Sequence, residues 1–421
     1  MSDLGRYTFI MRPLVALLLC LLPMFAGGIA PDEYKSRRAE LRRSLDGAMI
    51  LFGAEESEDQ HYAFFQESNF LYLSGWREPG AVMLLTRTDE ILFLPPRNAQ
   101  GEIFTGRKTL PEDRDAAERT GFAKVLPRAA IETSYLRLIE SSRNVYMLPG
   151  DARAQKLRSL AALHEERNAG PEIAKLRVMK SPAEIALIAQ STDATVAAHL
   201  AAWNRLQPGL FEYEIAATMT SVYLGRGCER SAYAPIVGSG PDSLILHYMS
   251  NHRRVDSGEM VLMDVGAECS DYATDVTRTV PANGKFTARQ REIYDIVLGA
   301  QKAAIAAVRP GARLRGDGGS LQGIAQDYIN THGKDLHGES LGRYFTHGLS
   351  HFVGLEVHDP GDTVQPLKAG MVITIEPGIY IPEENIGVRI EDTVLVTEDG
   401  ARVLSSALPR EAAEIEKRIG K

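Results

Sequence analysis

The sequence predicts an α/β protein of two domains, and three observations lead to this expectation. Its 421 residues exceed what a single hydrophobic core usually organises. Strand-like apolar runs alternate with helical stretches from residue 31 to about residue 170. Beyond that point a long amphipathic helix, a Pro-Gly pair, a second helix and strands follow in an order that occurs twice. We therefore expect an N-terminal α/β domain and a C-terminal domain of two related halves that face each other across a cleft.

Composition excludes some functional classes. Hydrophobic residues make up 44% of the chain and the net charge is -8, values that are typical of an ordinary globular protein. The densest basic run, Arg37-Arg38 with Arg42-Arg43, is interpreted as a solvated helix face. Because no basic stripe with interleaved aromatic residues occurs, nucleic-acid binding is not expected.

Residues 1–30 are predicted to form a secretory signal peptide. Arg12 precedes an apolar run from Leu14 to Leu22, which is too short to span a bilayer comfortably, and small residues follow from Ala26 to Ala30. The mature chain would begin near residues 27–31, and the protein would be exported to a periplasm or secreted.

The start and the fate of this segment have alternatives. Met11 gives a more compact signal than Met1, because the arginine then directly precedes the apolar run. A retained membrane anchor is the rival interpretation. Lipid modification at Cys20 is weakly supported, since Leu17 to Leu19 lack the small residues expected before such a cysteine.

Removal of the signal peptide would leave two cysteines, Cys228 and Cys269. An oxidising compartment would allow them to pair. We expect them to be free and buried instead.

The N-terminal domain is expected over residues 31–171. Its predicted strands cover 48–52, 81–86 and 90–94, and its predicted helices cover 112–119, 134–141 and 155–168. Ala169-Gly170-Pro171 is interpreted as the linker to the second domain.

The C-terminal domain, residues 172–421, contains two clear helix starts. Ser181-Pro182-Ala183-Glu184 and Thr287-Ala288-Arg289-Gln290 are capping boxes, in which the first side chain and the fourth satisfy each other's backbone amides. Each predicted helix ends at a Pro-Gly pair, and second helices are expected at 212–224 and 321–332.

Acidic residues stand in unusual places within the C-terminal domain. Asp264 ends the apolar run Met260 to Met263, and Asp275 opens the run Val276 to Val280 after a turn-like stretch, although aspartate is depleted in strands. A hairpin would bring both carboxylates to one side, where their charges would repel unless a cation intervened. Glu376 and Glu391 also follow hydrophobic residues in strand-like runs. Four carboxylates would neutralise two divalent ions, and one imidazole would complete the shell.

The histidines are individually less informative. His347 and His351 are four residues apart, but no glutamate follows the first, so a helical zinc motif is disfavoured. His358 precedes a turn signal at 359–361 and is placed at the end of an extended run. His247 lies in a strand-like run, where a histidine is more often a satisfied core residue than a catalytic one.

A resemblance to a known family rests on several of these segments together. The series LHYMSN, MDVGAECSDYATDVTRTVP, HGLSHFVGLEVHDPG, TIEPGIYIP and GVRIEDTVLV resembles the pita-bread metallopeptidases, in particular the branch of aminopeptidase P and prolidase. The runs at 65–75 and 78–81 resemble the creatinase-like N-terminal domain of aminopeptidase P. The resemblance implies a pita-bread catalytic domain with pseudo-two-fold halves.

The resemblance also implies a role for each site residue. Asp264 would bind one metal ion, Asp275 and Glu391 would bridge both, and His351 and Glu376 would complete the second; His351 takes this role because it lies seven residues before His358. The metals would generate hydroxide to attack the scissile carbonyl, with Glu376 as general base. His247 and His358 would stabilise the intermediate or move protons. Arg389, two residues before Glu391 and so expected on the same strand face, would orient a bridging carboxylate. By the resemblance, His347 would lie nearby, and Tyr380 would form a wall of the substrate pocket with the HGLSH run.

The implied activity is that of an Xaa-Pro aminopeptidase, which removes the first residue of peptides with proline second. Manganese is the expected metal, because oxygen ligands with one imidazole suit it, and zinc or cobalt are alternatives. The alternative function is an Xaa-Pro dipeptidase with a closed pocket. A metal-free binding protein, or a metal-free hydrolase of guanidino compounds, would lack the ligands that this chain retains. Family likeness suggests a dimer or tetramer.

Overall fold

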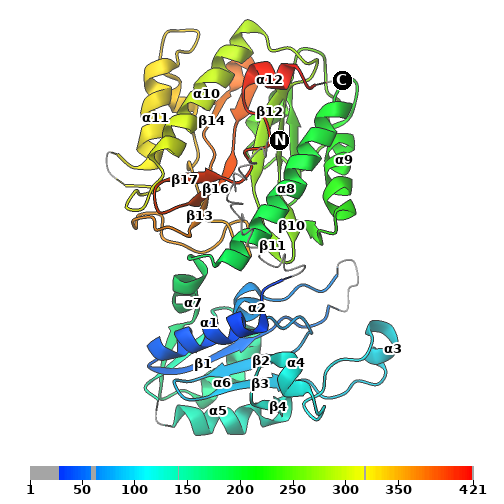
Figure 1. The fold of residues 1–421 in the computed structure, drawn as a ribbon, viewed down its shortest axis with the longest axis vertical. Helices are drawn as coiled ribbons and strands as arrows, with labels where there is room; N and C mark the ends of the chain where they lie inside the picture. The colour runs from blue at the N-terminus through cyan, green and yellow to red at the C-terminus, as the bar shows by residue number, and fades with distance from the viewer. Residues whose placement is uncertain (1–27, 58–62, 141, 317–318, 420–421) are drawn as a thin grey trace, which may run out of the picture.

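The protein is represented by a computed structural model, of which residues 28–57, 63–140, 142–316 and 319–419 are described (Figure 1). Residues 1–27, which hold most of the predicted signal peptide, lie outside the described part, so that prediction stays untested. Within the described part, no helix has the length and apolar character needed to cross a bilayer. Two domains are visible in Figure 1, the N-terminal one below the C-terminal one.

The N-terminal domain is built on a six-stranded mixed sheet with the order β4-β3-β2-β1-β5-β6. β1 pairs antiparallel with β2 and parallel with β5. The strands are β1 Gly47–Phe52, β2 Val82–Leu85, β3 Glu90–Leu94, β4 Val125–Pro127, β5 Asn144–Met147 and β6 Glu165–Asn168. The helices are α1 Pro31–Ser44, α2 Ser68–Ser74, α3 Gly101–Thr105, α4 Ala116–Thr120, α5 Ile131–Ile139 and α6 Gln155–Leu160.

The central strand β1 is buried on both faces, as its continuous apolar sequence requires. Met49 and Leu51 pack into a cluster with Leu41 of α1 and Phe70 of α2. The residues between them, such as Ile50, pack with Tyr135 and Ile139 of α5 and with Leu157 of α6. The side-chain alternation of a strand therefore divides its residues between two layers of helices.

The predicted strands of this domain are confirmed, and its helices needed correction. The helix predicted over 155–168 ends at Leu160, and residues 165–168 form β6, a strand that is exposed throughout. Parallel pairing with β5 overrides the weak strand preference of its polar residues. The predicted linker at 169–171 instead begins helix α7, Gly170–Arg177, with proline in the first turn. Helices α4 and α5 also differ from their predicted ranges by several residues.

The C-terminal domain contains two long helix pairs, as predicted. α8 Pro182–Arg205 packs on α9 Glu212–Gly225, and α10 Ala288–Ala307 packs on α11 Leu321–His332. Both predicted capping boxes are present. The side chains of Ser181 and Thr287 each accept from the backbone amide three residues on, and the side chains of Glu184 and Gln290 accept from the backbone amides of Ser181 and Thr287. These caps fix where each long helix starts. The last helix is α12 Ala412–Glu416.

Each helix pair is followed by strands that line the centre of the domain (Figure 1). The first group is β7 Arg230–Ser231, β8 Ile236–Ser239, β9 Met260–Val265, β10 Ala267–Cys269, β11 Tyr272–Ala273 and β12 Val276–Pro281. The second is β13 Val372–Ile375, β14 Gly378–Ile381, β15 Ile386–Arg389, β16 Asp392–Val396 and β17 Ala401–Val403. Their sheets have the orders β11-β10-β7, β12-β9-β8, β13-β16-β17 and β14-β15.

The two cysteines are paired, which corrects the expectation that they are free. A disulfide joins Cys228, just after α9, to Cys269 in β10. Both residues are buried, as expected. β7 begins two residues after Cys228 and pairs with β10, so backbone pairing brings the two sulfur atoms together.

Candidate metal centre

The hairpin of β9 and β12 positions the first two carboxylates. Asp264 in β9 lies opposite Thr277 in β12, and Asp275 directly precedes β12. Because Asp275 and Thr277 are two residues apart on an extended chain, Asp275 and Asp264 project from the same face. Both aspartates are buried. The predicted hairpin geometry is therefore present.

His351 and Glu376 come from two backbone segments that lie side by side. Glu376 follows β13, and its amide donates to Leu349 O at 2.9 Å, while the Thr374 amide donates to His351 O at 2.9 Å. The HGLSH run is thus extended rather than helical, in agreement with the argument against a helical zinc motif. Thr374 Oγ1 accepts from the His351 amide at 3.1 Å and donates to Glu376 Oε1 at 3.2 Å.

Glu391 lies where the chain passes from β15 to β16. β15 pairs with β14 up to Arg389, and β16 pairs with β13 from Asp392. The Glu391 amide donates to Thr277 O at 3.0 Å, and Thr277 Oγ1 donates to Glu391 Oε2 at 2.7 Å. The side chain is therefore held against the β9 and β12 hairpin of the other half.

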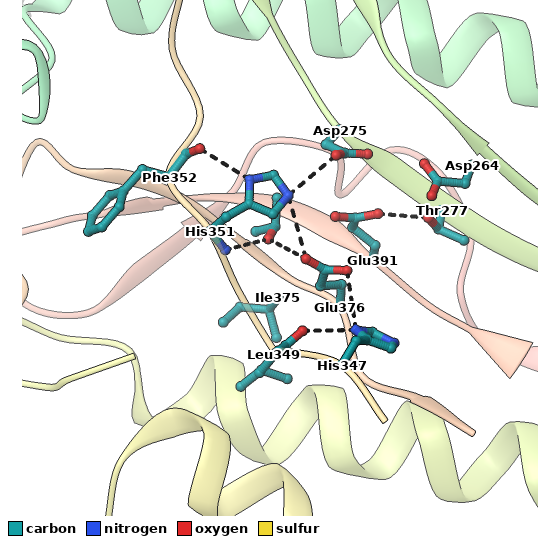
Figure 2. Close-up of polar contacts among 12 residues, drawn as sticks. Asp264, Asp275, Thr277, His347, Leu349, His351, Phe352, Ile375, Glu376 and Glu391 are labelled. Carbon is teal, nitrogen blue, oxygen red and sulfur yellow. Dashed lines mark hydrogen bonds and ion pairs between the residues drawn. The ribbon is translucent and has the colours of Figure 1, made fainter. Parts of the chain in front are cut away.

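Figure 2 shows these side chains converging on one space between the strands. Among the described residues, Asp275, His351 and Glu391 each offer a ligand atom within 4.8 Å of the others. His351 Nε2 lies 3.4 Å from Asp275 Oδ2 and 3.5 Å from Glu376 Oε1. Asp264 lies on the far side of Asp275, and the two carboxylates share a hydrogen-bond partner. The five residues thus form two groups that share Asp275: one contains Asp264, and the other contains His351, Glu376 and Glu391.

That shared partner is Tyr233, which the sequence did not single out. Its hydroxyl lies 2.5 Å from Asp264 Oδ1 and also contacts Asp275 Oδ1. One hydroxyl carries one proton, so it can donate to only one of the two carboxylates at a time. The segment between β7 and β8 that carries Tyr233 has no distinctive local pattern, and only the fold places it here.

Arg389 contacts a different carboxylate from the one expected. Its guanidinium forms an ion pair with Asp264, not with Asp275 or Glu391, and its Nε donates to Thr277 Oγ1 at 3.3 Å. The reason is that β15 ends at Arg389, so this residue and Glu391 do not belong to one strand. Arg389 is buried, as is its carboxylate partner.

Tyr380 is not a wall of the cavity, which is a second correction. It is 5% exposed, and its hydroxyl lies 2.8 Å from Arg389 Nη1 and 2.8 Å from His347 Nε2. His347 Nδ1 lies 2.9 Å from the carbonyl of Gly348, which can only accept. This pattern assigns the proton to Nδ1, so Nε2 accepts from Tyr380.

The remaining two histidines face the same cavity from irregular segments. His247 follows the short 3₁₀ helix Gly240–Leu244 in a turn, not in the predicted strand. His358 lies in the bent loop between Val353 and Asp359, so the predicted extended run is also wrong. The rings of His351 and His358 meet edge to face, with centroids 4.4 Å apart.

The cavity has a volume of about 450 Å³. Its lining includes every predicted site residue except Tyr380, namely Asp264, Asp275, His247, His347, His351, His358, Glu376, Arg389 and Glu391. Apolar residues such as Ile236, Leu246 and Val357 form other parts of its wall, and Arg315 lies beside Gly348. The carboxylates would hold a charged reaction centre, and the apolar wall would contact an uncharged side chain of a bound ligand.

The carboxylates of the cavity floor are buried and close together, and both conditions shift their pKa values. Burial, followed by the charges of neighbouring carboxylates, raises the pKa of Glu391 well above its ordinary value. Burial also raises the pKa of Glu376 to about 7 and raises the pKa of Asp275. Burial is the largest single influence on Asp264 and raises its pKa, but the charge of Arg389 together with hydrogen bonds from Tyr233 and Arg389 leaves that pKa lowered.

The residues present fit a metal centre. Glu391 Oε1 is buried and has no hydrogen-bond partner among the described residues, which is costly unless a cation takes its lone pairs. His351 Nδ1 lies 3.1 Å from the Phe352 carbonyl and so carries a proton, which leaves Nε2 directed at Asp275 and Glu376. A histidine with one nitrogen so engaged offers the other as a metal ligand. Four carboxylates and one imidazole suit two divalent ions.

Comparison with known proteins agrees with this geometry. Residues 186–398 match metallopeptidase family M24, and residues 34–146 match the N-terminal domain of aminopeptidase P. The Xaa-Pro aminopeptidase of Haemophilus influenzae is 35% identical, over 91% of this chain and 96% of its own length. The Xaa-Pro aminopeptidase of Escherichia coli is 34% identical, over 92% and 97%. The structure of aminopeptidase P from E. coli in a low-pH form superimposes with a TM-score of 0.84 at 32% identity, covering 93% of this chain and 98% of that one.

Proposed function

The chain belongs to metallopeptidase family M24, and we propose that it is a two-metal Xaa-Pro aminopeptidase that removes the first residue of peptides with proline second. It is a metallo-aminopeptidase of the aminopeptidase P type. The observation that carries the proposal is the convergence of Asp275, His351 and Glu391, with ligand atoms within 4.8 Å, on the floor of the cavity.

We assign the metal ligands to Asp264, Asp275, His351, Glu376 and Glu391. Asp275 and Glu391 would bridge the two ions, because Asp275 lies between Asp264 and His351 and Glu391 offers its unpartnered oxygen. When bound, the ions would activate a water molecule and polarise the scissile carbonyl.

The side chains around the ions would perform the proton transfers. Glu376, a buried carboxylate, would take a proton from the attacking water while the water oxygen bonds to the carbonyl carbon. It would then deliver that proton to the proline nitrogen as the C–N bond breaks, because this tertiary amide nitrogen has no hydrogen of its own. His247 and His358, which line the cavity, would donate hydrogen bonds to the oxygen of the tetrahedral intermediate.

We propose manganese as the ion. Four carboxylates and one imidazole form a hard, oxygen-rich shell, whereas zinc more often takes sulfur or several imidazoles. Zinc or cobalt would occupy the same shell. Metal-free protein reconstituted separately with each ion, and compared for activity at equal occupancy, distinguishes these possibilities.

A set of three peptides tests the proposed activity. Manganese-reconstituted protein should release alanine from Ala-Pro-Ala and leave Ala-Ala-Ala intact, and a chelator should abolish the release. Glu376→Gln should remove activity without unfolding the protein. Cleavage of Ala-Pro in strong preference to Ala-Pro-Ala would instead identify an Xaa-Pro dipeptidase, and activity that persists in chelator would refute the metal mechanism.

Export and assembly belong to the same proposal. We propose that residues 1–30 direct the protein to a periplasm or the medium and that it assembles as a dimer or tetramer. Cell fractionation with mass determination of the mature N-terminus tests the first, and a protein that keeps residues 1–30 in the cytoplasm would contradict it. Light scattering on the purified protein tests the second.

A further inference from the structure

A cluster of buried charges lies outside the cavity, behind the loop that carries His358. The side chain of Asp359 is 1% exposed, and it accepts two charged hydrogen bonds. Arg177 Nη2 donates to Oδ1 at 2.6 Å and Lys180 Nζ donates to Oδ2 at 2.9 Å. The two cations are 2% and 0% exposed. Charges removed from water in this way are stable only while their partners stay in place.

The cluster joins three parts of the chain. Arg177 ends α7 and Lys180 precedes the cap of α8, so both lie on the segment between the two domains. Arg177 Nη1 also donates at 2.8 Å to Asn69 Oδ1 in α2 of the N-terminal domain. Apolar packing continues across this boundary, because Phe70 belongs to the same cluster as Val353 and Leu355. Asp359 is therefore anchored to the N-terminal domain through Arg177.

The same aspartate is tied to two histidines of the cavity. It directly follows His358 in the chain, and its amide donates to Phe352 O at 2.9 Å. That carbonyl also accepts from His351 Nδ1 at 3.1 Å. Gly354 packs so closely on Asp359 that a Cβ at this position would lie 2.5 Å from Asp359 Oδ2. The loop from His351 to Asp359 thus closes on itself around the buried carboxylate.

We propose that Arg177 and Lys180 hold Asp359 as a clamp that positions His351 and His358, so that the N-terminal domain supports the reaction through Asn69. The role of the histidines rests on the function proposed above. Arg177, Lys180, Asp359 and Asn69 do not line the cavity, so they are positioning residues and act only through the loop.

A clamp of this kind makes a distinct kinetic prediction. The loop presents groups that act on the reacting bond, whereas most of the apolar wall that holds the substrate comes from other segments. Loosening the loop should therefore lower kcat far more than it raises KM. Loss of general stability would also lower the apparent kcat and leave the KM unchanged, so kcat is calculated per folded molecule. It would not change the histidine environment of the folded protein, and that environment therefore separates the two explanations.

Two variants of the full chain test the clamp, and a third serves as control. Asp359→Asn keeps the shape of the side chain and removes its charge, and Asn69→Ala removes one Arg177 contact to a half-buried side chain of the N-terminal domain. Asp335→Asn is the matched control, because Asp335 is also buried, pairs with Arg343 and accepts two backbone amides, yet does not line the cavity. We expect kcat on Ala-Pro-Ala to fall at least tenfold in the first variant and about threefold in the second, with KM within threefold of the wild-type value.

Ring nitrogen NMR of ¹⁵N-histidine-labelled, metal-free protein gives a readout that needs no activity. His351→Ala and His358→Ala identify the two signals. We expect both signals to shift in the Asp359 and Asn69 variants and to stay unchanged in the Asp335 control. If the Asp359 variant does not fold, the Asn69 variant decides alone.

Wild-type kcat and unshifted signals in the folded variants would overturn the clamp. A wild-type enzyme that cleaves no Xaa-Pro peptide would refute the proposed function instead. The NMR comparison would then still show whether the charges position the loop.

Discussion

The hydroxyl of Tyr380 donates to Nε2 of His347 over 2.8 Å and accepts from Nη1 of Arg389 over the same distance. One buried hydroxyl thereby links a histidine on the cavity wall to the guanidinium that pairs with Asp264. Burial lowers the pKa of His347 to about 4, so the ring is neutral and can accept.

Tyr380→Phe should lower the free energy of unfolding by about 1 to 3 kcal/mol, because His347 and Arg389 each keep a buried polar group without its partner. Tyr135→Phe is the matched control, since the Tyr135 hydroxyl is buried without a hydrogen-bond partner among the described residues. Its removal should be neutral or stabilising. Denaturant unfolding of both variants checks this, and equal losses would contradict the linking role of Tyr380.

Glu268 should make the protein less stable as pH rises from about 4.5 to 7. Burial raises its pKa from 4.5 to about 7, although Arg230 partly opposes the shift. In this interval the folded state holds a proton that the unfolded chain has lost, so raising the pH favours unfolding. Glu268→Gln should reduce this pH dependence and add on the order of 1 to 3 kcal/mol at pH 8. Identical pH profiles of unfolding for the wild-type protein and the Glu268→Gln variant would contradict this role of Glu268.

Reduction of the bond between Cys228 and Cys269 should destabilise the C-terminal domain. The cysteines are 41 residues apart, and a loop of this length corresponds to roughly 3 to 4 kcal/mol of chain entropy. Thermal unfolding with and without reductant measures the effect, and the double variant Cys228→Ser with Cys269→Ser should not respond to reductant. Two free thiols in the protein purified without reductant would show that the bond does not form.

Asp392→Ala should be among the most destabilising single changes, at about 3 to 5 kcal/mol. The carboxylate is fully buried and accepts from Arg278 Nη2 at 2.7 Å and from Ser405 Oγ at 2.6 Å. Its loss leaves the Arg278 guanidinium buried and without its counter-charge. Asp256→Ala, which removes an exposed partner of Arg253, should cost less than about 1 kcal/mol. Denaturant unfolding measures both variants, and equal losses of unfolding free energy would contradict this prediction.

The sequence predicted the parts of the fold that depend on local signals. Ser181 and Thr287 open their helices because the capping boxes satisfy backbone amides whatever the surroundings. The placements of Asp264 and Asp275 were predictable because carboxylates in neighbouring apolar runs repel each other unless a cation lies between them. Residues 165–168, by contrast, are polar and became a strand only through pairing with β5.

Other features depend on contacts between distant segments and could not be predicted. Tyr233 reaches Asp264 from a connection without periodicity, and Arg389 contacts a carboxylate 125 residues away. The cysteine pairing depends on the register of β7 with β10, which no local pattern encodes. Tyr380 was expected at the cavity surface from the family resemblance alone, whereas hydrogen bonds with Arg389 and His347 hold it behind the wall.

The central claim is that the carboxylate and histidine cluster holds two metal ions required for peptide hydrolysis. Elemental analysis of the purified protein, with peptidase activity measured on the same samples, tests it most directly. We predict that activity rises with metal content to saturation at about two ions per chain, and that Glu391→Gln lowers both together, because it removes one bridging ligand. Full activity on Ala-Pro-Ala in protein that contains no divalent metal would contradict the account.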